Sequence, residues 1–255
     1  MICIWIRVER GQTQTVVGEL TALDEVRYTS YATGAYDLIA MVVLHSSQLR
    51  VFLEQRLSQV KGIKEKDISF ILDIRKQTYD WAPWSHLAAG RAAEASDGKP
   101  YAPSVDEMDR EIIGYLQRDG RWPYSDIARR LGVTERSIRR RVLEMRDDGV
   151  LRIVGVTNPF MVGMNTLAVV ALKVEQYQLE TIVTEIIRHR QIRYVAVSSG
   201  VYDVIFEVIL QSNQQLFHFL VETLTRVPGI LRTDTSLVLN ISKMDYSDIH
   251  GMGHV

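Results

Sequence analysis

Two stretches of the chain, VRYTSYATGAYDLI at residues 26–39 and IRYVAVSSGVYDVI at residues 192–205, share an Arg-Tyr pair and a Gly-x-Tyr-Asp element. They lie 166 residues apart, and the similarity continues at a spacing of 167 after a one-residue insertion. The further matched positions are Phe52, Leu53, Leu57, Val60, Gly62, Ile63, Asp67, Ser69, Leu72, Ile74, Lys76 and Tyr79, which recur as Phe219, Leu220, Leu224, Val227, Gly229, Ile230, Asp234, Ser236, Leu239, Ile241, Lys243 and Tyr246. A match of this length indicates two copies of one domain.

Each copy has the pattern strand, helix, strand, strand, helix, strand. In the second copy the nearly continuous apolar run at Ala168–Val174 predicts a buried strand, and the first copy has its equivalent at Ile2–Val8. The other predicted elements of the second copy are a helix at Gln178–Arg188, strands at Ile192–Ser198 and Val201–Leu210, a helix at Gln214–Thr225 and a strand at Thr235–Ile241. This order predicts an α+β fold with two ferredoxin-like βαββαβ domains.

Both helices of such a domain cover one face of its sheet, so the other apolar face must be covered by another element. A second copy of the same domain can provide that cover. The pairing could occur within one chain as a pseudo-dimer, or between subunits of a homodimer or higher homo-oligomer. The sequence leaves both possibilities open.

The segment between the repeats predicts a helix-turn-helix. A linker rich in Pro, Gly, Ala and Ser at residues 81–103 leads to Ser104, a predicted N-cap with Glu107 in capping-box position. A short helix is predicted at Ser125–Leu131, a turn at Gly132, and a second helix from its N-cap Thr134 to about Asp148.

The second helix of this motif concentrates positive charge. Residues 129–146 hold seven arginines against two glutamates, although the chain as a whole has a net charge of −1. Ile138, Val142 and Met145 share the inward face, so the helical step turns Arg136 and Arg140 outward. Arginines in this position can donate hydrogen bonds to guanine in the major groove or neutralise phosphates. The alternative for this face is a solvated, arginine-rich helix without a nucleic-acid partner.

These residues together resemble the leucine-responsive and asparagine-related regulators, the Lrp/AsnC or feast/famine family. The segments that carry the resemblance are residues 106–113, 119–121, 126–133, 137–142 and 149–151, the connection 153–159, and the two Gly-x-Tyr-Asp elements. The resemblance implies a sequence-specific transcriptional regulator with a winged-type helix-turn-helix and two RAM-type effector domains that pair as in a dimeric α-β barrel. It also implies double-stranded DNA and a small effector, an amino acid, as partners.

By this resemblance two sets of site residues are expected. The DNA-binding residues are Arg129, Arg130, Thr134, Arg136, Ser137, Arg139, Arg140 and Arg141. The effector-binding residues are Thr33, Gly34, Tyr36 and Asp37 in the first copy and Ser199, Gly200, Tyr202 and Asp203 in the second. A glycine amide can receive a carboxylate and an aspartate can receive an ammonium group. The alternative is that the glycines and aspartates only fix a hairpin while the tyrosines only pack.

The predicted organisation is a first RAM-like domain at residues 1–80, the linker 81–103, the DNA-binding domain 104–152, a second RAM-like domain 153–246 and a tail 247–255. The extra sensor copy ahead of a single DNA-binding domain departs from the family pattern. A helical segment equivalent to the one before the second copy is expected either to have been lost ahead of the first copy or to lie upstream of the assigned start. The connection at 153–159 assigns the DNA-binding domain to the second copy, which suggests a duplicated regulator without a second DNA-binding domain.

Composition sets further limits on function. Cys3 is the only cysteine, so an intramolecular disulfide and a thiolate metal cluster are excluded. The apolar start at residues 1–6 is too short to span a membrane, and a cytoplasmic protein without cofactor or metal is expected. His250 and His254 are attributed to a polar tail.

Two other functions compete with the regulator. One is an enzyme like the heme-pathway decarboxylases, which share this domain arrangement. The other is a ligand-sensing assembly protein that does not bind DNA. The arginines of the second helix favour DNA binding, and the chain contains no nucleophile elbow or phosphate loop.

Overall fold

The computed structural model describes residues 1–78, 105–155 and 159–245. The described residues fall into two units, one made of 1–78 with 159–245 and the other of 105–155, and each unit is considered by itself. The linker expected at 81–103 and the tail expected at 247–255 lie outside the described residues. So do Tyr79, Ser104, Tyr246, His250 and His254.

In the first unit, residues 1–78 and 159–245 follow the same order of elements. The first half consists of β1 (Ile2–Val8), α1 (Thr13–Thr21), β2 (Val26–Ala32), β3 (Leu38–Val42), α2 (Leu49–Val51) and β4 (Ile63–Gln77). The second half consists of β5 (Thr166–Val174), α6 (Leu179–Ile187), β6 (Ile192–Gly200), β7 (Val204–Leu210), α7 (Asn213–His218) and β8 (Ile230–Met244). Short 3-10 turns occupy Ser46–Gln48, Pro159–Val162 and Gln176–Gln178.

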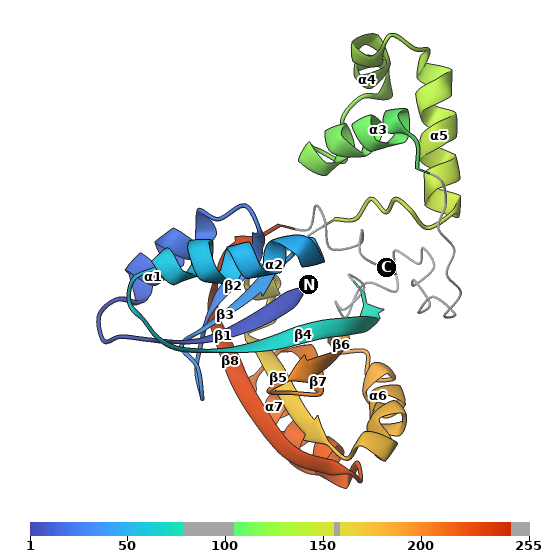
Figure 1. Ribbon diagram of the computed structural model, residues 1–255. Coiled ribbons are helices and arrows are strands. Elements are labelled where there is room, and N and C mark those ends of the chain that lie inside the picture. Colours follow the sequence, from blue (N-terminus) through green and yellow to red (C-terminus); the bar gives the residue numbers. More distant parts are fainter. Residues whose placement is uncertain (79–104, 156–158, 246–255) are drawn as a thin grey trace. The chain divides into compact units, whose positions relative to one another are not determined.

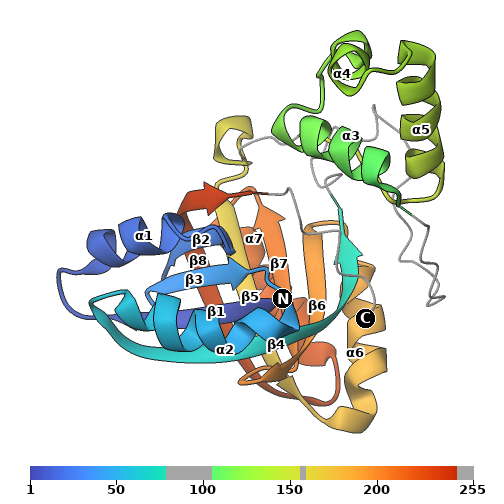
Figure 2. The same cartoon turned by 45° about the horizontal axis from the view of Figure 1, so that its top comes forward.

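The eight strands close into one antiparallel barrel, in the order β1-β3-β2-β8-β5-β7-β6-β4 (Figures 1 and 2). The two 15-residue strands join the halves, because β4 pairs with β1 and also with β6, while β8 pairs with β5 and also with β2. The pairing that the sequence left open therefore takes place inside one chain.

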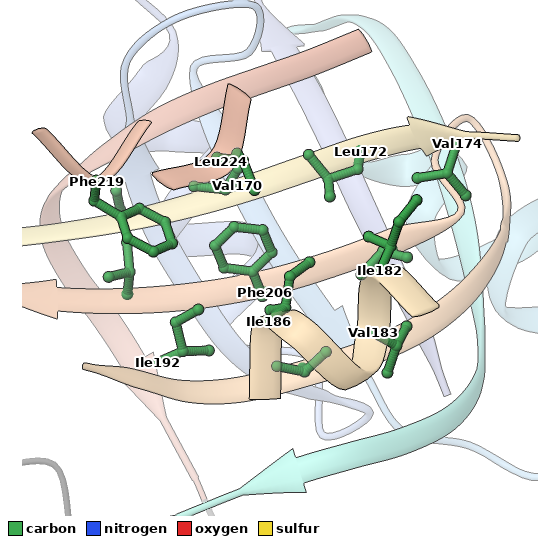
Figure 3. Close-up of a cluster of buried hydrophobic side chains, with 14 of the residues drawn as sticks. Val170, Leu172, Val174, Ile182, Val183, Ile186, Ile192, Phe206, Phe219 and Leu224 are labelled. Carbon is green, nitrogen blue, oxygen red and sulfur yellow. The ribbon is translucent and has the colours of Figure 1, made fainter. Parts of the chain in front are cut away.

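The strands β1, β5 and β7 are buried on both faces along most of their length, which explains their nearly continuous apolar sequences. All but one of the nine residues of β5 are buried. Val170, Leu172 and Val174 pack with Ile182 and neighbouring side chains of α6 and α7 on the outside (Figure 3). The alternate residues Leu167, Val169 and Ala171 point into the barrel interior, where the two halves share a second core. In the first half, α1 and the α2 segment cover the outer face of β1 and β3 in the same way.

The helix predicted at Gln214–Thr225 is not one regular α-helix. After α7, a π-helical turn covers Phe219–Thr223 and a 3-10 turn covers Leu224–Arg226. Phe219 and Leu224 are both buried although they lie five residues apart, and a π-turn suits that spacing. The first half repeats the arrangement, with a π-turn at Phe52–Arg56 and a 3-10 turn at Leu57–Gln59.

Lysines of the two long strands bind helix ends of the opposite half. Lys76 of β4 donates to the carbonyl oxygens of Ile187 and His189 after α6, at 2.8 and 2.7 Å. Lys243 of β8 donates to those of Thr21 and Leu23 after α1, at 3.0 and 2.9 Å. Each lysine satisfies carbonyl groups that a helix end leaves free and places positive charge at its negative pole.

The second unit contains α3 (Glu107–Arg118), α4 (Tyr124–Leu131) and α5 (Glu135–Asp147) around a small core (Figure 1). The expected capping box at Ser104 and Glu107 is wrong, because Asp106 caps α3 and exchanges hydrogen bonds with Asp109. An aspartate two positions later meets the same requirement, since its carboxylate also accepts from a free amide.

The turn and second helix of the motif are found as predicted. Gly132 ends α4 in the left-handed conformation, with φ of +68°, and Thr134 caps α5. Between residues 105 and 155 no β-strand follows α5, so the wing expected from the sequence is not present in this described segment.

Candidate nucleic-acid interface and effector loops

Helix α5 is fixed by its cap and by one buried stripe. The Thr134 hydroxyl accepts a hydrogen bond from the Ser137 amide at 3.2 Å. Ile138, Val142 and Met145 are buried in the core of the unit, as the sequence predicts. The opposite face of α5 is therefore held toward solvent.

The exposed face of α5 carries three arginines that differ in their pairing. Arg140 donates to both carboxylate oxygens of Glu144, at 2.8 and 3.0 Å, and Arg139 donates to Glu135 at 3.1 Å. Arg136 is exposed and makes no ion pair with any residue that the structure describes. Exposed pairs of this i,i+4 type contribute only about 0.3–0.5 kcal/mol, so phosphates or bases can replace the glutamates at little cost.

Arg141 is placed differently from its neighbours. Its guanidinium donates to Asp106 at 2.7 Å and to Asp109 at 2.8 Å, and its side chain is only 23% exposed. The pKa of Asp106 is lowered, first by the hydrogen bond from the Asp109 amide and then by Arg141. Arg141 therefore ties α5 to the start of α3 and positions the helix.

The remaining basic residues expected at the interface lie on α4. Arg129 pairs with Asp126 at 2.8 Å, and Arg130 lies over the ring of Trp122 at 5.5 Å. From α5, Arg139 lies over the ring of Tyr124 at 5.6 Å. Both arginines of α4 are exposed, so they can reach a phosphate backbone.

The two Gly-x-Tyr-Asp loops lie at the junctions between the barrel halves. Gly34 and Gly200 have φ of +98° and +116°. A Cβ atom on Gly34 would lie 3.0 Å from the carbonyl oxygen of Thr235, and one on Gly200 would lie 2.5 Å from that of Ile68. Each loop thus touches the long strand of the other half, and glycine is required by conformation and by space.

Thr33 and Ser199 occupy these junctions too. The backbone of Thr33 donates to the carbonyl of Leu237 at 3.0 Å, and its hydroxyl accepts from the Leu237 amide at 3.2 Å. Ser199 is exposed near the end of β6, where it is the pairing partner of Phe70. Both residues therefore belong to the inter-half ladders.

The two aspartates of the loops differ in their surroundings. Asp37 accepts a hydrogen bond from the Val8 amide at 2.8 Å and is exposed. Asp203 accepts from the Val174 amide at 3.0 Å and also from Lys173 at 2.8 Å, and it is buried. Both carboxylates secure their hairpins, but only that of Asp203 is neutralised by a lysine of its own half.

The two tyrosines meet in the barrel interior. Tyr36 donates to Asp67 at 2.7 Å and Tyr202 donates to Asp234 at 2.5 Å, while Trp5 packs against both rings at 5.7 and 4.9 Å. The pKa of each tyrosine is raised, first by burial and then by its aspartate.

Asp67 and Asp234 recur at one register of the repeat, although their role does not follow from the sequence alone. Their recurrence was the available signal, since equivalent carboxylates in both copies point to a shared contact. Trp5 gave no such signal, because the residue at the equivalent position of the second copy is Ala171.

Comparison with known families agrees with this geometry. A model of the Lrp/AsnC ligand binding domain matches residues 1–81 and again 167–248, and one of the AsnC-type helix-turn-helix domain matches residues 105–146. The chain belongs to the Lrp/AsnC family. It is a helix-turn-helix transcriptional regulator with a DNA-binding domain and ligand-binding domains.

Relatives of known sequence are regulators of the same type. An uncharacterized HTH-type transcriptional regulator of Pyrococcus furiosus is 33% identical over 146 residues, which cover 57% of this chain and 99% of the relative. The HTH-type transcriptional regulator FL11 of Pyrococcus abyssi is 30% identical over 141 residues, or 55% of this chain and 93% of the relative. Each relative therefore accounts for little more than half of this chain.

Solved structures share the fold. AsnC of E. coli covers 56% of this chain and 97% of its own with a TM-score of 0.50 and 21% identity. A feast or famine regulatory protein from M. tuberculosis, complexed with L-methionine, covers the same shares with a TM-score of 0.50 and 23% identity.

Among the described residues, no helix is long and apolar enough to cross a membrane. Within the same residues, no group of three or more His, Cys, Asp or Glu side chains is arranged to hold a metal ion.

Proposed function

We propose that this Lrp/AsnC regulator reads DNA through α5 and responds to an amino acid bound at the loops between its barrel halves. The observation that carries the first part is the exposed arginine face of α5, opposite a fully buried stripe. A helix held in this way can enter the major groove and present side chains to base edges.

The arginines of α4 and α5 are assigned to different roles according to their exposure and their ion pairs. Arg136 and Arg140 reach base edges, with Ser137 and Arg139 beside them. Thr134 and the α4 arginines, Arg129 and Arg130, contact phosphates. Arg141 supports DNA binding indirectly, because its ion pairs with Asp106 and Asp109 hold α5 in place.

A gel-shift assay with two double variants tests this assignment. Arg136→Ala/Arg140→Ala removes two charges from the reading face, whereas Arg110→Ala/Arg118→Ala removes two charges from exposed positions of α3. The first variant should lose specific binding to the cognate promoter and the second should keep it. Specific binding that survives in the first variant would contradict the proposal.

For the effector we propose an α-amino acid. Two structural neighbours were solved as complexes with L-methionine, one from Neisseria meningitidis and one from M. tuberculosis. In this chain the ammonium group would be received by Asp37, which is exposed and has no lysine partner, while Asp203 is already paired with Lys173. The carboxylate would lie at the backbone of the loops near Gly34 and Gly200. The remaining predicted contacts are Thr33, Tyr36, Ser199 and Tyr202.

Isothermal titration with a panel of amino acids tests the effector site. Asp37→Asn should abolish or strongly weaken binding of the amino acid that the wild type takes up, and Asp203→Asn should change it much less. Equal losses in the two variants would mean that the halves contribute alike, and no loss in either would remove the site from these loops.

We also propose that the barrel halves are duplicated RAM-type domains, each with the ferredoxin-like order, at residues 1–80 and 153–246, with the DNA-binding domain at 104–152 between them. Paired features support the duplication. Lys76 and Lys243 make equivalent bonds, as do the pairs Tyr36 with Asp67 and Tyr202 with Asp234.

A further inference from the structure

Helix α5 exposes one large apolar side chain to solvent. Leu143 is 47% exposed and does not belong to the core of its unit, although its neighbour Val142 is buried there. Between residues 105 and 155, the other large apolar residue with comparable exposure is Ile153, which lies outside the helix. Leu143 therefore contributes little to the core of the described unit, and its apolar side chain is available to a binding partner.

The position of Leu143 on the helix indicates which partner this is. At about 100° per residue, Leu143 shares a strip about 60° wide with Arg136 and Arg140. This strip lies opposite the buried stripe that contains Ile138 and Met145, and all three of its residues are exposed. Leu143 therefore faces the same partner as the two arginines that are proposed to reach base edges.

Charge limits how much of α5 can approach DNA. Beyond Leu143 the strip continues at Asp147, and Asp148 is the C-cap of the helix. Both aspartates are exposed. The phosphate backbone repels carboxylates and attracts the arginines of the preceding turns. Leu143 is therefore the last residue of the strip that can lie in the groove.

An apolar side chain in the major groove has one favourable target among the standard bases. Phosphates and the polar edges of guanine, adenine and cytosine lose hydrogen bonds to water when a leucine covers them. Thymine presents an apolar group in the groove, its C5-methyl. The helix rises about 1.5 Å per residue, so Leu143 lies about 10 Å along the axis from Arg136, or about three base steps.

We propose that Leu143 determines specificity for thymine by packing on its C5-methyl group, about three base pairs from the guanine that Arg136 contacts. This inference rests on the proposed reading of DNA by α5, and it adds a second base and a spacing to the site.

Deoxyuridine substitution tests the contact, because it removes only the methyl group of thymine. The probe is the shortest duplex that the wild type retains in a selection of genomic fragments, with each thymine replaced in turn by deoxyuridine. At one thymine, or at a symmetry-related pair, the replacement should weaken wild-type binding about four-fold per methyl group. The same replacement should leave the affinity of Leu143→Ala unchanged.

Two controls accompany this experiment. Leu72→Ala shortens a leucine that is 65% exposed on β4, in the other unit, and it should respond to deoxyuridine as the wild type does. Replacing each guanine in turn by 7-deazaguanine removes the N7 acceptor, so the guanine whose replacement weakens the wild type but not Arg136→Ala is the one that Arg136 contacts. It should lie about two to four base pairs from the sensitive thymine. Circular dichroism will verify that Leu143→Ala is folded.

The outcomes separate this inference from the proposed function. If the wild type binds the duplex but no deoxyuridine replacement weakens binding, or if Leu143→Ala remains as sensitive as the wild type, the inference is overturned and DNA reading stands. A sensitive thymine more than about five base pairs from that guanine, half a turn of the duplex, would overturn it too. If the wild type retains no fragment in the selection, DNA reading fails and the inference falls with it.

Discussion

Gly200 gives a quantitative test of the seam between the barrel halves. At its φ of +116° a side chain is strained, and a Cβ atom would lie 2.5 Å from the carbonyl oxygen of Ile68 in the other half. The substitution Gly200→Ala therefore adds two costs. A left-handed conformation costs a residue with a Cβ about 1–2 kcal/mol, and overpacking against a backbone atom costs about 1–3 kcal/mol.

Gly11→Ala is the matched control for this substitution. Gly11 has φ of +82°, but nothing lies within 4 Å of its Cβ position, so this variant has only the conformational cost. Stability changes of this size shift the melting temperature by about 2–4 °C per kcal/mol in a chain of this length. Gly200→Ala should therefore melt about 4–20 °C below the wild type, and Gly11→Ala about 2–8 °C below it.

Thermal unfolding followed by circular dichroism measures both variants against the wild type. The difference between them reports the contact of Gly200 with β4. Equal melting temperatures for the two alanine variants would refute the claim that β6 and β4 approach this closely at the seam.

Three other predictions follow from the same contacts. Replacing Lys76 or Lys243 with Met should lower the free energy of unfolding, measured in urea, by about 1–2 kcal/mol each. The two losses should add, because the sites are independent. A double variant with the same free energy of unfolding as the wild type would contradict the capping role. Arg141→Met should destabilise the helix-turn-helix at neutral pH. Because the pKa of Asp106 is depressed, its stabilising effect is fully present above the ordinary aspartate pKa and is lost as pH falls through the lowered folded-state pKa. The difference in melting temperature between variant and wild type should therefore be largest at pH 7 and should shrink as the pH is lowered into the acid range; a difference that does not change with pH would contradict the ion pair. The DNA affinity should fall with salt, with a log–log slope of about −3 per bound unit if three or four arginines neutralise phosphates; a slope near zero would exclude phosphate contacts.

The regular pattern of the repeats made much of the barrel predictable from the sequence. β1 occupies the predicted residues, and α6 lies within the predicted helix, because both have one uninterrupted apolar pattern. Pairing of the two halves within one chain was not predictable, since β4 and β8 can form hydrogen bonds with strands of the same chain or of another chain. The 15-residue length of these strands was missed, because their outer ends alternate exposed polar residues with few apolar ones.

The buried face of the helix that carries the candidate DNA-binding residues could be predicted from the sequence, whereas the pairing of the site residues could not. The stripe of Ile138, Val142 and Met145 correctly predicted which face of α5 is buried. The inward pairing of Arg141 was not visible, because its partner Asp106 lies 35 residues away in sequence. The difference between Asp37 and Asp203 likewise depends on Lys173, which pairs with Asp203. The equivalent residue of the first copy, Arg7, is also basic, so the sequence does not reveal that only one aspartate is paired.

The most direct test of the regulator's central property is a selection of genomic DNA fragments, performed with the wild type and with Arg136→Ala/Arg140→Ala, each with and without an amino-acid panel. The wild type should enrich fragments that share one roughly palindromic motif, with an enrichment that changes when the effector is present, and the variant should enrich none. Enrichment of the same fragments by both proteins would contradict the account that α5 reads the sequence.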